Sequence, residues 1–126
     1  MCAYIIVTMN ATEIVSKQEM IKKFGEVFDF KLFKTLSEPV RIRILEFLML
    51  NGRSDIESIA KDMPQDRSVI SRHCQLMHEA GILICEKESR HKYYSIDGQH
   101  FVDQLEKFLN QIKKCISMCC PTTCCK

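Results

Sequence analysis

The sequence predicts a mainly helical α+β domain in which one β-hairpin lies between the last two helices. Two observations predict this fold class. Apolar residues recur at three- and four-residue intervals over most of the chain, and two short β-prone runs flank a charged segment near residue 90. The chain has 126 residues, with 46% hydrophobic and 27% charged residues, which is typical of one globular domain with a modest core.

A first helix is predicted over residues 17–29, followed by a short helical piece. Ser16 and Glu19 have the spacing of a capping box at its start. The apolar residues at helical spacing are Met20, Phe24, Val27, Phe28, Leu32, Phe33 and Leu36.

Three further helices are predicted between residues 37 and 81. Ser37-Glu38-Pro39 starts the first, because proline is tolerated in a first helical turn, and Asn51-Gly52 stops it. A capping box from Ser54 to Glu57 opens a short helix, and Asp66 is expected to cap a helix that Gly81 closes. The residues expected to be buried are Val40, Ile44, Leu45, Leu48, Ile56, Ile59, Ala60, Val69, Ile70, Cys74, Met77 and Ala80.

The pattern changes to β after Gly81. Residues 82–85 and 93–96 are β-prone, and the charged residues 86–92 between them are expected to form a turn. A long last helix follows Asp97-Gly98. The predicted order of elements is that of a winged helix-turn-helix: helix, helix, short helix, helix, hairpin and helix. The stripe of the last helix consists of Phe101, Leu105, Phe108, Ile112, Cys115 and Cys119.

The helix that begins after Asp66 has the side chains that a DNA-recognition helix needs. Short hydroxyl groups permit close approach to phosphates, and long planar or amide groups reach base edges. A solvated polar helix face is the alternative. The predicted DNA contacts on this helix are Arg67, Ser68, Ser71, Arg72, His73 and Gln75.

The charged segment of the hairpin is the second predicted DNA contact. Lys87, Arg90 and Lys92, together with His91, outnumber the acidic residues Glu86 and Glu88 there. A basic loop beside a recognition helix suits contact with phosphates or the minor groove. An exposed charged turn without a partner is the alternative.

Several motifs together resemble the ArsR/SmtB family of winged-helix repressors. Leu36–Leu45 matches the family opening L-x-x-P-x-R-x-x-I-L, and Ser68–His73 with Glu79–Leu83 is similar to its S-x-V-S-R-H…E-A-G-L-V signature. Tyr93-Tyr94 matches the tyrosine pair at the end of its wing. The resemblance covers roughly residues 30–112. It implies a homodimer that pairs through its first and last helices and binds a palindromic operator. It also implies that the affinity for DNA falls when an inducer binds.

Five of the eight cysteines lie in the last twelve residues of the chain. Thiolates are soft ligands that favour thiophilic ions. Three of them would suit As(III) or Sb(III), and four would suit tetrahedral Zn(II) or Cd(II). We therefore predict a DNA-binding and dimerisation domain over residues 1–112 and an inducer-binding tail over residues 113–126. The predicted metal ligands are Cys115, Cys119, Cys120, Cys124 and Cys125.

The other cysteines and the family's usual inducer sites support this choice. Many family members carry a Cys-Val-Cys pair where this chain has Asp55-Ile56-Glu57, and the zinc site of the last helix lacks a second histidine after His100 and Asp103. Cys74 and Cys85 are expected to be packing residues. Cys2 remains open as a ligand donated across a dimer.

Other functions are weighed against this one. A redox- or sulfide-responsive repressor of the same fold is the main alternative, since paired thiols also form disulfides. A metallochaperone would lack the recognition-helix signature, and an enzyme would need a Cys-x-x-Cys or another nucleophile–base pair, which this sequence does not show. No apolar run is long enough to span a bilayer, and no secretory signal is seen, so we expect a cytoplasmic protein. We expect neither association with a membrane nor a protein substrate.

Overall fold

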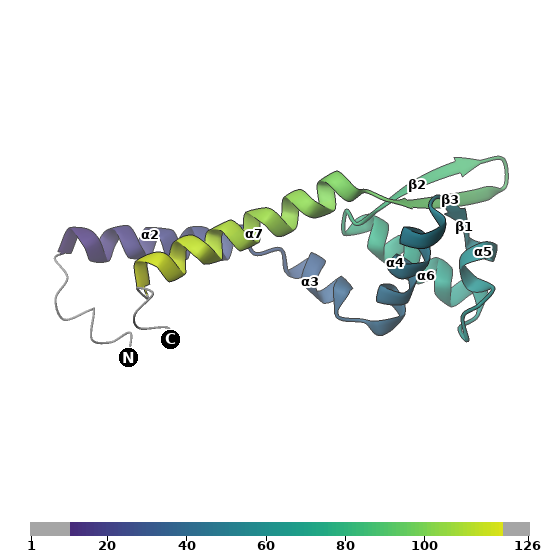
Figure 1. The fold of residues 1–126 in the computed structure, drawn as a ribbon, viewed down its shortest axis with the longest axis horizontal. Helices are drawn as coiled ribbons and strands as arrows, with labels where there is room; N and C mark the ends of the chain where they lie inside the picture. The colour runs from purple at the N-terminus through teal and green to yellow at the C-terminus, as the bar shows by residue number, and fades with distance from the viewer. Residues whose placement is uncertain (1–10, 120–126) are drawn as a thin grey trace. The chain divides into compact units, whose positions relative to one another are not determined.

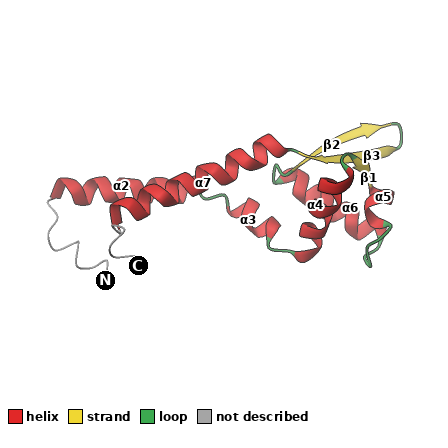
Figure 2. Ribbon diagram, in the orientation of Figure 1, coloured by secondary structure: helices red, strands yellow, loops and turns green. Residues whose placement is uncertain are grey.

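The computed structural model describes residues 11–119, with side chains from Ser16 to Met118, and confirms the predicted order of elements (Figure 1). Figure 2 shows a mainly helical chain with its strands gathered in one small sheet. The helices are α2 (Ala11–Val27), α3 (Phe30–Leu36), α4 (Pro39–Asn51), α5 (Ile56–Ala60), α6 (Arg67–Glu79) and α7 (Gly98–Cys119), and the strands are β1 (Ser54–Asp55), β2 (Leu83–Glu88) and β3 (His91–Ile96).

The described chain divides into two units. Residues 30–102 form the winged unit, and residues 11–29 with 103–119 form a helical unit. The start of the predicted tail, residues 113–119, continues α7. None of the helices within residues 11–119 is long and apolar enough to cross a membrane.

In the helical unit, aromatic rings join α2 to α7. The Phe108 ring lies 5.2 Å from that of Phe28 and 5.7 Å from that of Phe24, measured between centroids. The Gln111 side chain donates a hydrogen bond of 3.2 Å to the Met20 carbonyl oxygen. The apolar stripe that was predicted for the last helix is therefore packed against α2.

The predicted start of the first helix at residue 17 is wrong. The helix α2 begins at Ala11 and ends at Val27, so that Ser16 is an exposed residue inside it. No glycine or proline precedes Ser16 in this helix, and nothing local prevents the helix from extending back. The capping-box spacing was therefore a coincidence of exposed polar residues.

The helix α4 follows the prediction closely. Glu38 is its N-cap and Pro39 its first residue, and Gly52 ends it with a φ of 71°, a value that favours glycine. Ile44 and Leu45 are buried together with Leu48, while Val40 is only half-buried.

The short helix α5 is capped by Asp55 and not by Ser54 as predicted. The Asp55 carboxylate accepts a hydrogen bond of 3.0 Å from the backbone amide of Ser58. Ser54 instead pairs with Tyr94 in a third strand, β1, that the prediction lacked. Its hydroxyl donates to the Gly52 carbonyl oxygen at 2.9 Å. Aspartate caps as well as serine does, so the cap moves one residue on and leaves Ser54 free for the sheet.

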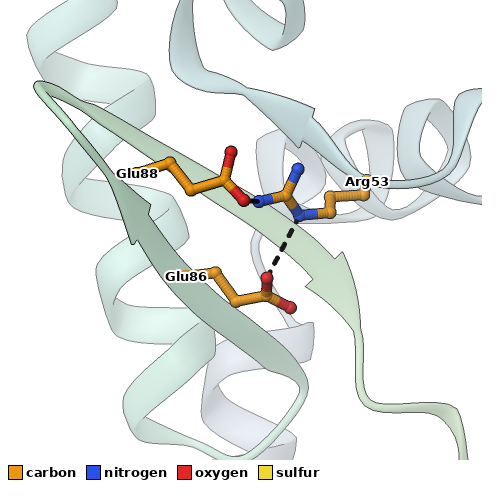
Figure 3. Close-up of polar contacts among 3 residues, drawn as sticks. All are labelled: Arg53, Glu86 and Glu88. Carbon is orange, nitrogen blue, oxygen red and sulfur yellow. Dashed lines mark hydrogen bonds and ion pairs between the residues drawn. The ribbon is translucent and has the colours of Figure 1, made fainter.

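The strands of the hairpin extend further than predicted, because residues 86–88 and 91–92 belong to the ladder rather than to a turn. The sheet order is β1-β3-β2, with Glu86 opposite Tyr93 and Glu88 opposite His91. Arg53 binds both carboxylates: its Nε lies 3.3 Å from Glu86 Oε2 and its Nη2 lies 2.7 Å from Glu88 Oε1 (Figure 3). Its guanidinium also stacks 4.2 Å from the centroid of the Tyr93 ring. The positive charge of Arg53 therefore offsets the repulsion between the Glu86 and Glu88 carboxylates, which would otherwise disfavour a strand.

The core of the winged unit lies between the helices and the inner face of the sheet. On α6 the buried residues are Ile70, Cys74 and Met77, spaced four and three residues apart. Val69 was predicted to be buried but is 40% exposed, because it lies one residue and about 100° away from that stripe. The largest fully buried side chains are those of Tyr94, Leu32, Ile44, Ile59, Ile70, Met77, Ile82 and Cys74.

Candidate nucleic-acid interface

The polar side of α6 faces away from the core. Arg67 and Ser68, in its first turn, are exposed, as is Arg72, while Ser71 and Gln75 are half-buried. Asp66 is the N-cap residue, but its side chain makes no capping hydrogen bond. The first turn of α6 therefore presents backbone amides, a hydroxyl and a guanidinium on an accessible surface.

A pocket of about 510 Å³ joins the start of α6 to the hairpin and the start of α5. It brings together five of the residues predicted to contact DNA, and its cations outnumber its single carboxylate. The lining residues are Asp55, Ile56, Arg67, Ser68, Ser71, Arg90, His91 and Lys92.

His91 belongs to this pocket, although it is absent from the predicted set of DNA contacts. Its position between Arg90 and Lys92 in the hairpin was the available signal. The hydrogen bonds from Ser58 lower the pKa of the Asp55 carboxyl, and the nearby His91 adds to that effect. Asp55 is thus held in its ionised form beside the histidine.

Lys87 lies outside the pocket but directly opposite Lys92 across the hairpin. Residues opposite one another in an antiparallel ladder point to the same face of the sheet. Like charges in this position destabilise a hairpin unless a counter-charge accompanies them. The pair therefore forms a cationic site that would be stabilised by an anion.

His73 does not line the pocket. Its Nδ1 accepts a hydrogen bond of 3.2 Å from Arg41 Nε on α4, and the same guanidinium donates at 3.1 Å to the Thr35 carbonyl oxygen. His73 is half-buried, and burial, followed by the charge of Arg41, lowers its pKa. This contact ties α6 to α4, so His73 helps to fix the position of α6.

We expect the stability that neutral His73 provides to be lost below about pH 6.5. Its pKa is depressed in the folded chain, so at such pH the unfolded chain binds a proton that the folded chain does not. Above that range the contribution is complete. His73→Gln keeps an acceptor for Arg41 without a titrating group. Urea unfolding at about pH 7.5 and pH 5.5 should show a smaller fall in stability for this variant than for the parent, and equal falls would contradict the role given to His73.

Of the cysteines predicted to bind a metal, only Cys115 has a described side chain. It is half-buried, and its thiol lies 3.9 Å from the Met20 carbonyl oxygen and 4.0 Å from Gln111 Nε2. Cys119 lies one helical turn further along α7, and its side chain, like Cys2, Cys120, Cys124 and Cys125, lies outside the described residues. Among the residues that are described, no group of three or more His, Cys, Asp or Glu side chains has a metal-binding arrangement.

Comparison with known proteins identifies the family. No family model matches the chain. Over 82 residues it is 34% identical to a cadmium resistance transcriptional regulatory protein CadC homolog of Staphylococcus aureus, covering 64% of this chain and 68% of that protein. A solved structure described as a possible transcriptional regulator for arsenical resistance is 28% identical, with a TM-score of 0.58 over 67% of this chain and 85% of that one. The chain belongs to the ArsR family of winged-helix transcriptional regulators.

Other ArsR-family structures share the fold. One is the solution structure of a domain from Mycobacterium bovis, described as the homodimeric winged helix-turn-helix DNA-binding domain of a possible ArsR-family regulator. It superposes with a TM-score of 0.52 over 86% of this chain, at 18% identity. Membership of the ArsR family makes this protein a transcriptional regulator and not an enzyme. The hairpin of β2 and β3 is accordingly the wing, and α6 is the recognition helix.

Proposed function

We propose that this ArsR-family protein is a cytoplasmic homodimeric repressor that binds operator DNA and releases it when a thiophilic ion binds its C-terminal cysteines. The observation that carries the DNA-binding part is the cationic pocket between α6 and the wing. Its polar groups come from two elements that the fold holds together, and both contribute residues predicted from the sequence alone.

The pocket suits one phosphate of the DNA backbone. Arg67, Arg90 and Lys92 supply positive charge, and Ser68 supplies a hydroxyl at the start of α6. The first turn of a helix adds free amides and a positive dipole end, a combination that binds phosphates. A phosphate seated there fixes the register of α6 on the duplex. Arg72 and Gln75, further along the helix, then serve as the readers of base edges.

The wing is the second phosphate contact in this proposal. Replacing both Lys87 and Lys92 with alanine removes four lysines from the proposed homodimer, so it should weaken binding to all duplexes alike. The slope of log affinity against log salt should fall by about 3.6, since each phosphate contact contributes about 0.9. Fluorescence anisotropy over a salt series measures this slope. An unchanged slope, or a loss confined to one DNA sequence, would show that the lysines do not contact phosphates.

A second apolar stripe on α7 supports dimerisation. Val102, Leu109 and Ile116 are spaced seven residues apart, and each is about half-exposed. Seven-residue spacing keeps side chains on one side of a helix that pairs with another. The stripe that packs on α2 consists of different residues, so this one is free to meet a second copy. The winged-helix domain from Mycobacterium bovis is described as homodimeric, which supports a homodimer here as well.

Leu109→Glu is expected to convert the dimer into monomers, because it places a charge in the centre of the second stripe. A monomer presents one recognition helix, so operator affinity should fall together with dimerisation. Sedimentation velocity measures the mass, and Asn110→Glu, at the exposed neighbouring position, is the matched control. A Leu109→Glu protein that stays dimeric would rule out this interface.

The cysteines at the end of α7 suit an inducer site coupled to that interface. Cys115 and Cys119, four residues apart, share a face of the helix. Ligation of Cys115 would withdraw its thiol from the Met20 carbonyl oxygen and so disturb the contact between α2 and α7. As(III) or Sb(III), or alternatively Cd(II) or Zn(II), are the inducers that such thiolates would bind, with Cys119, Cys120, Cys124 and Cys125 as the other ligands.

A further inference from the structure

Two cysteines and a tyrosine meet between the recognition helix and the wing. Cys85 on β2 lies directly opposite Tyr94 on β3, so their side chains point to the same face of the wing. That face packs on α6, where Cys74 belongs to the buried stripe. Cys74 and Tyr94 are fully buried, whereas Cys85 is half-buried.

The surroundings of these three groups disfavour charge. Burial, and secondly the nearby Cys85 thiol, raise the pKa of Cys74 to about 12. Burial likewise raises the pKa of Tyr94, with further contributions from both cysteines. The Tyr94 hydroxyl is buried without a hydrogen-bond partner of good geometry among the described residues. Among the described residues, no positively charged group contributes to the pKa of Cys74 or Tyr94, so nothing there stabilises a thiolate.

We propose that Cys74 and Cys85 form a reversible disulfide that ties the recognition helix to the wing. A disulfide is neutral and apolar, so it suits a buried site that penalises thiolates. A metal held by two thiolates would need both of them ionised there. This site is separate from the C-terminal cysteines, and the proposal does not depend on DNA or inducer binding.

A low-molecular-weight disulfide is the oxidant in this proposal. The Cys85 thiol, the more accessible one, loses its proton, and its sulfur attacks one sulfur of the oxidant. One small thiolate leaves, and Cys85 carries the other half as a mixed disulfide. Cys74 then gives up its proton to solvent, and its sulfur attacks Cys85 Sγ and expels the second small thiolate. Two cysteine thiols are oxidised, and one small disulfide is reduced to two thiols. The second step should be slow and should accelerate as the pH rises, because Cys74 is buried.

The test uses a chain in which the six other cysteines are replaced by serine, treated with oxidised glutathione at about pH 8.5. Both thiols should disappear, the mass should fall by two hydrogen atoms, and the unfolding midpoint should rise by several degrees. In the same background, Cys74→Ser should stop at a glutathione adduct on Cys85, and Cys85→Ser should stay unmodified. Peptide mapping of the alkylated full chain with all its cysteines gives a second readout that does not depend on the serine replacements.

Three results would overturn the proposal. The first is a glutathione adduct on Cys85 that persists when Cys74 is present. The second is a pair of thiols that both resist oxidation in the folded chain. The third is a link between two chains in place of a link within one, which gives twice the mass on a non-reducing gel.

Discussion

Ser68→Glu is expected to weaken operator binding by at least about 100-fold. Ser68 lines the pocket proposed for a backbone phosphate, and a carboxylate there would face the phosphate directly. Juxtaposed like charges at an interface cost several kcal/mol, and about 2.7 kcal/mol corresponds to a factor of 100. Fluorescence anisotropy with a labelled operator measures the loss.

The substitution should leave the fold intact. Glutamate in the first turn of a helix interacts favourably with the helix dipole, so α6 should be as stable as before or slightly more so. Ser117→Glu, at an exposed position of α7, makes the same change of charge in the other unit and should bind the operator nearly as well as the parent. Equal affinities for the two variants would mean that no phosphate occupies the pocket.

Replacing Cys119 and Cys120 with serine is expected to abolish release of DNA by the inducing ion while leaving DNA affinity without the ion unchanged. Coupling free energies between an effector and a ligand are typically 1–3 kcal/mol, so the parent should lose about 5- to 150-fold in affinity on ion binding and the variant should lose none. Titrating the preformed complex with arsenite, antimonite, cadmium or zinc measures the response.

Cys85→Ser is the matched control for this prediction. It removes one thiol from the wing and keeps those of the tail, so its ion response should equal that of the parent. An undiminished response in the Cys119 and Cys120 variant would contradict the proposed inducer site. Release by the thiol oxidant diamide but by none of these ions would favour the redox-responsive alternative.

The helices and strands were largely predictable because their signals are local. Pro39 and Gly52 mark the two ends of α4 through their own backbone preferences, and the stripe of Ile70, Cys74 and Met77 fixes the buried side of α6. Local signals failed at the starts of two helices, where a serine with capping-box spacing does not act as the cap. Ser16 and Ser54 both have the spacing of a capping box, yet one lies inside a helix and the other joins a sheet.

The features of the site that depend on distant residues were not predictable. The charge of Glu86 and Glu88 suggested a turn, and Arg53, more than thirty residues earlier, keeps both in a strand. Arg41 likewise donates a hydrogen bond to His73 from another helix, a contact that no local pattern in the sequence predicts. By contrast, the residue types in the pocket were predictable, because hydroxyl groups and cations at solvent-facing positions need little tertiary information.

Selection of duplexes from a random pool by the metal-free, reduced protein tests whether α6 and the wing bind operator DNA. If α6 and the wing of a homodimer read DNA, the enriched duplexes should share a palindrome whose half-sites lie about one helical turn, 10–10.5 base pairs, or a multiple of it apart. Binding to that palindrome should be tighter than to an unrelated duplex by at least about 1000-fold. Failure to enrich any sequence, with equal affinity for all duplexes at physiological salt, would contradict the assignment of this surface as an operator-binding site.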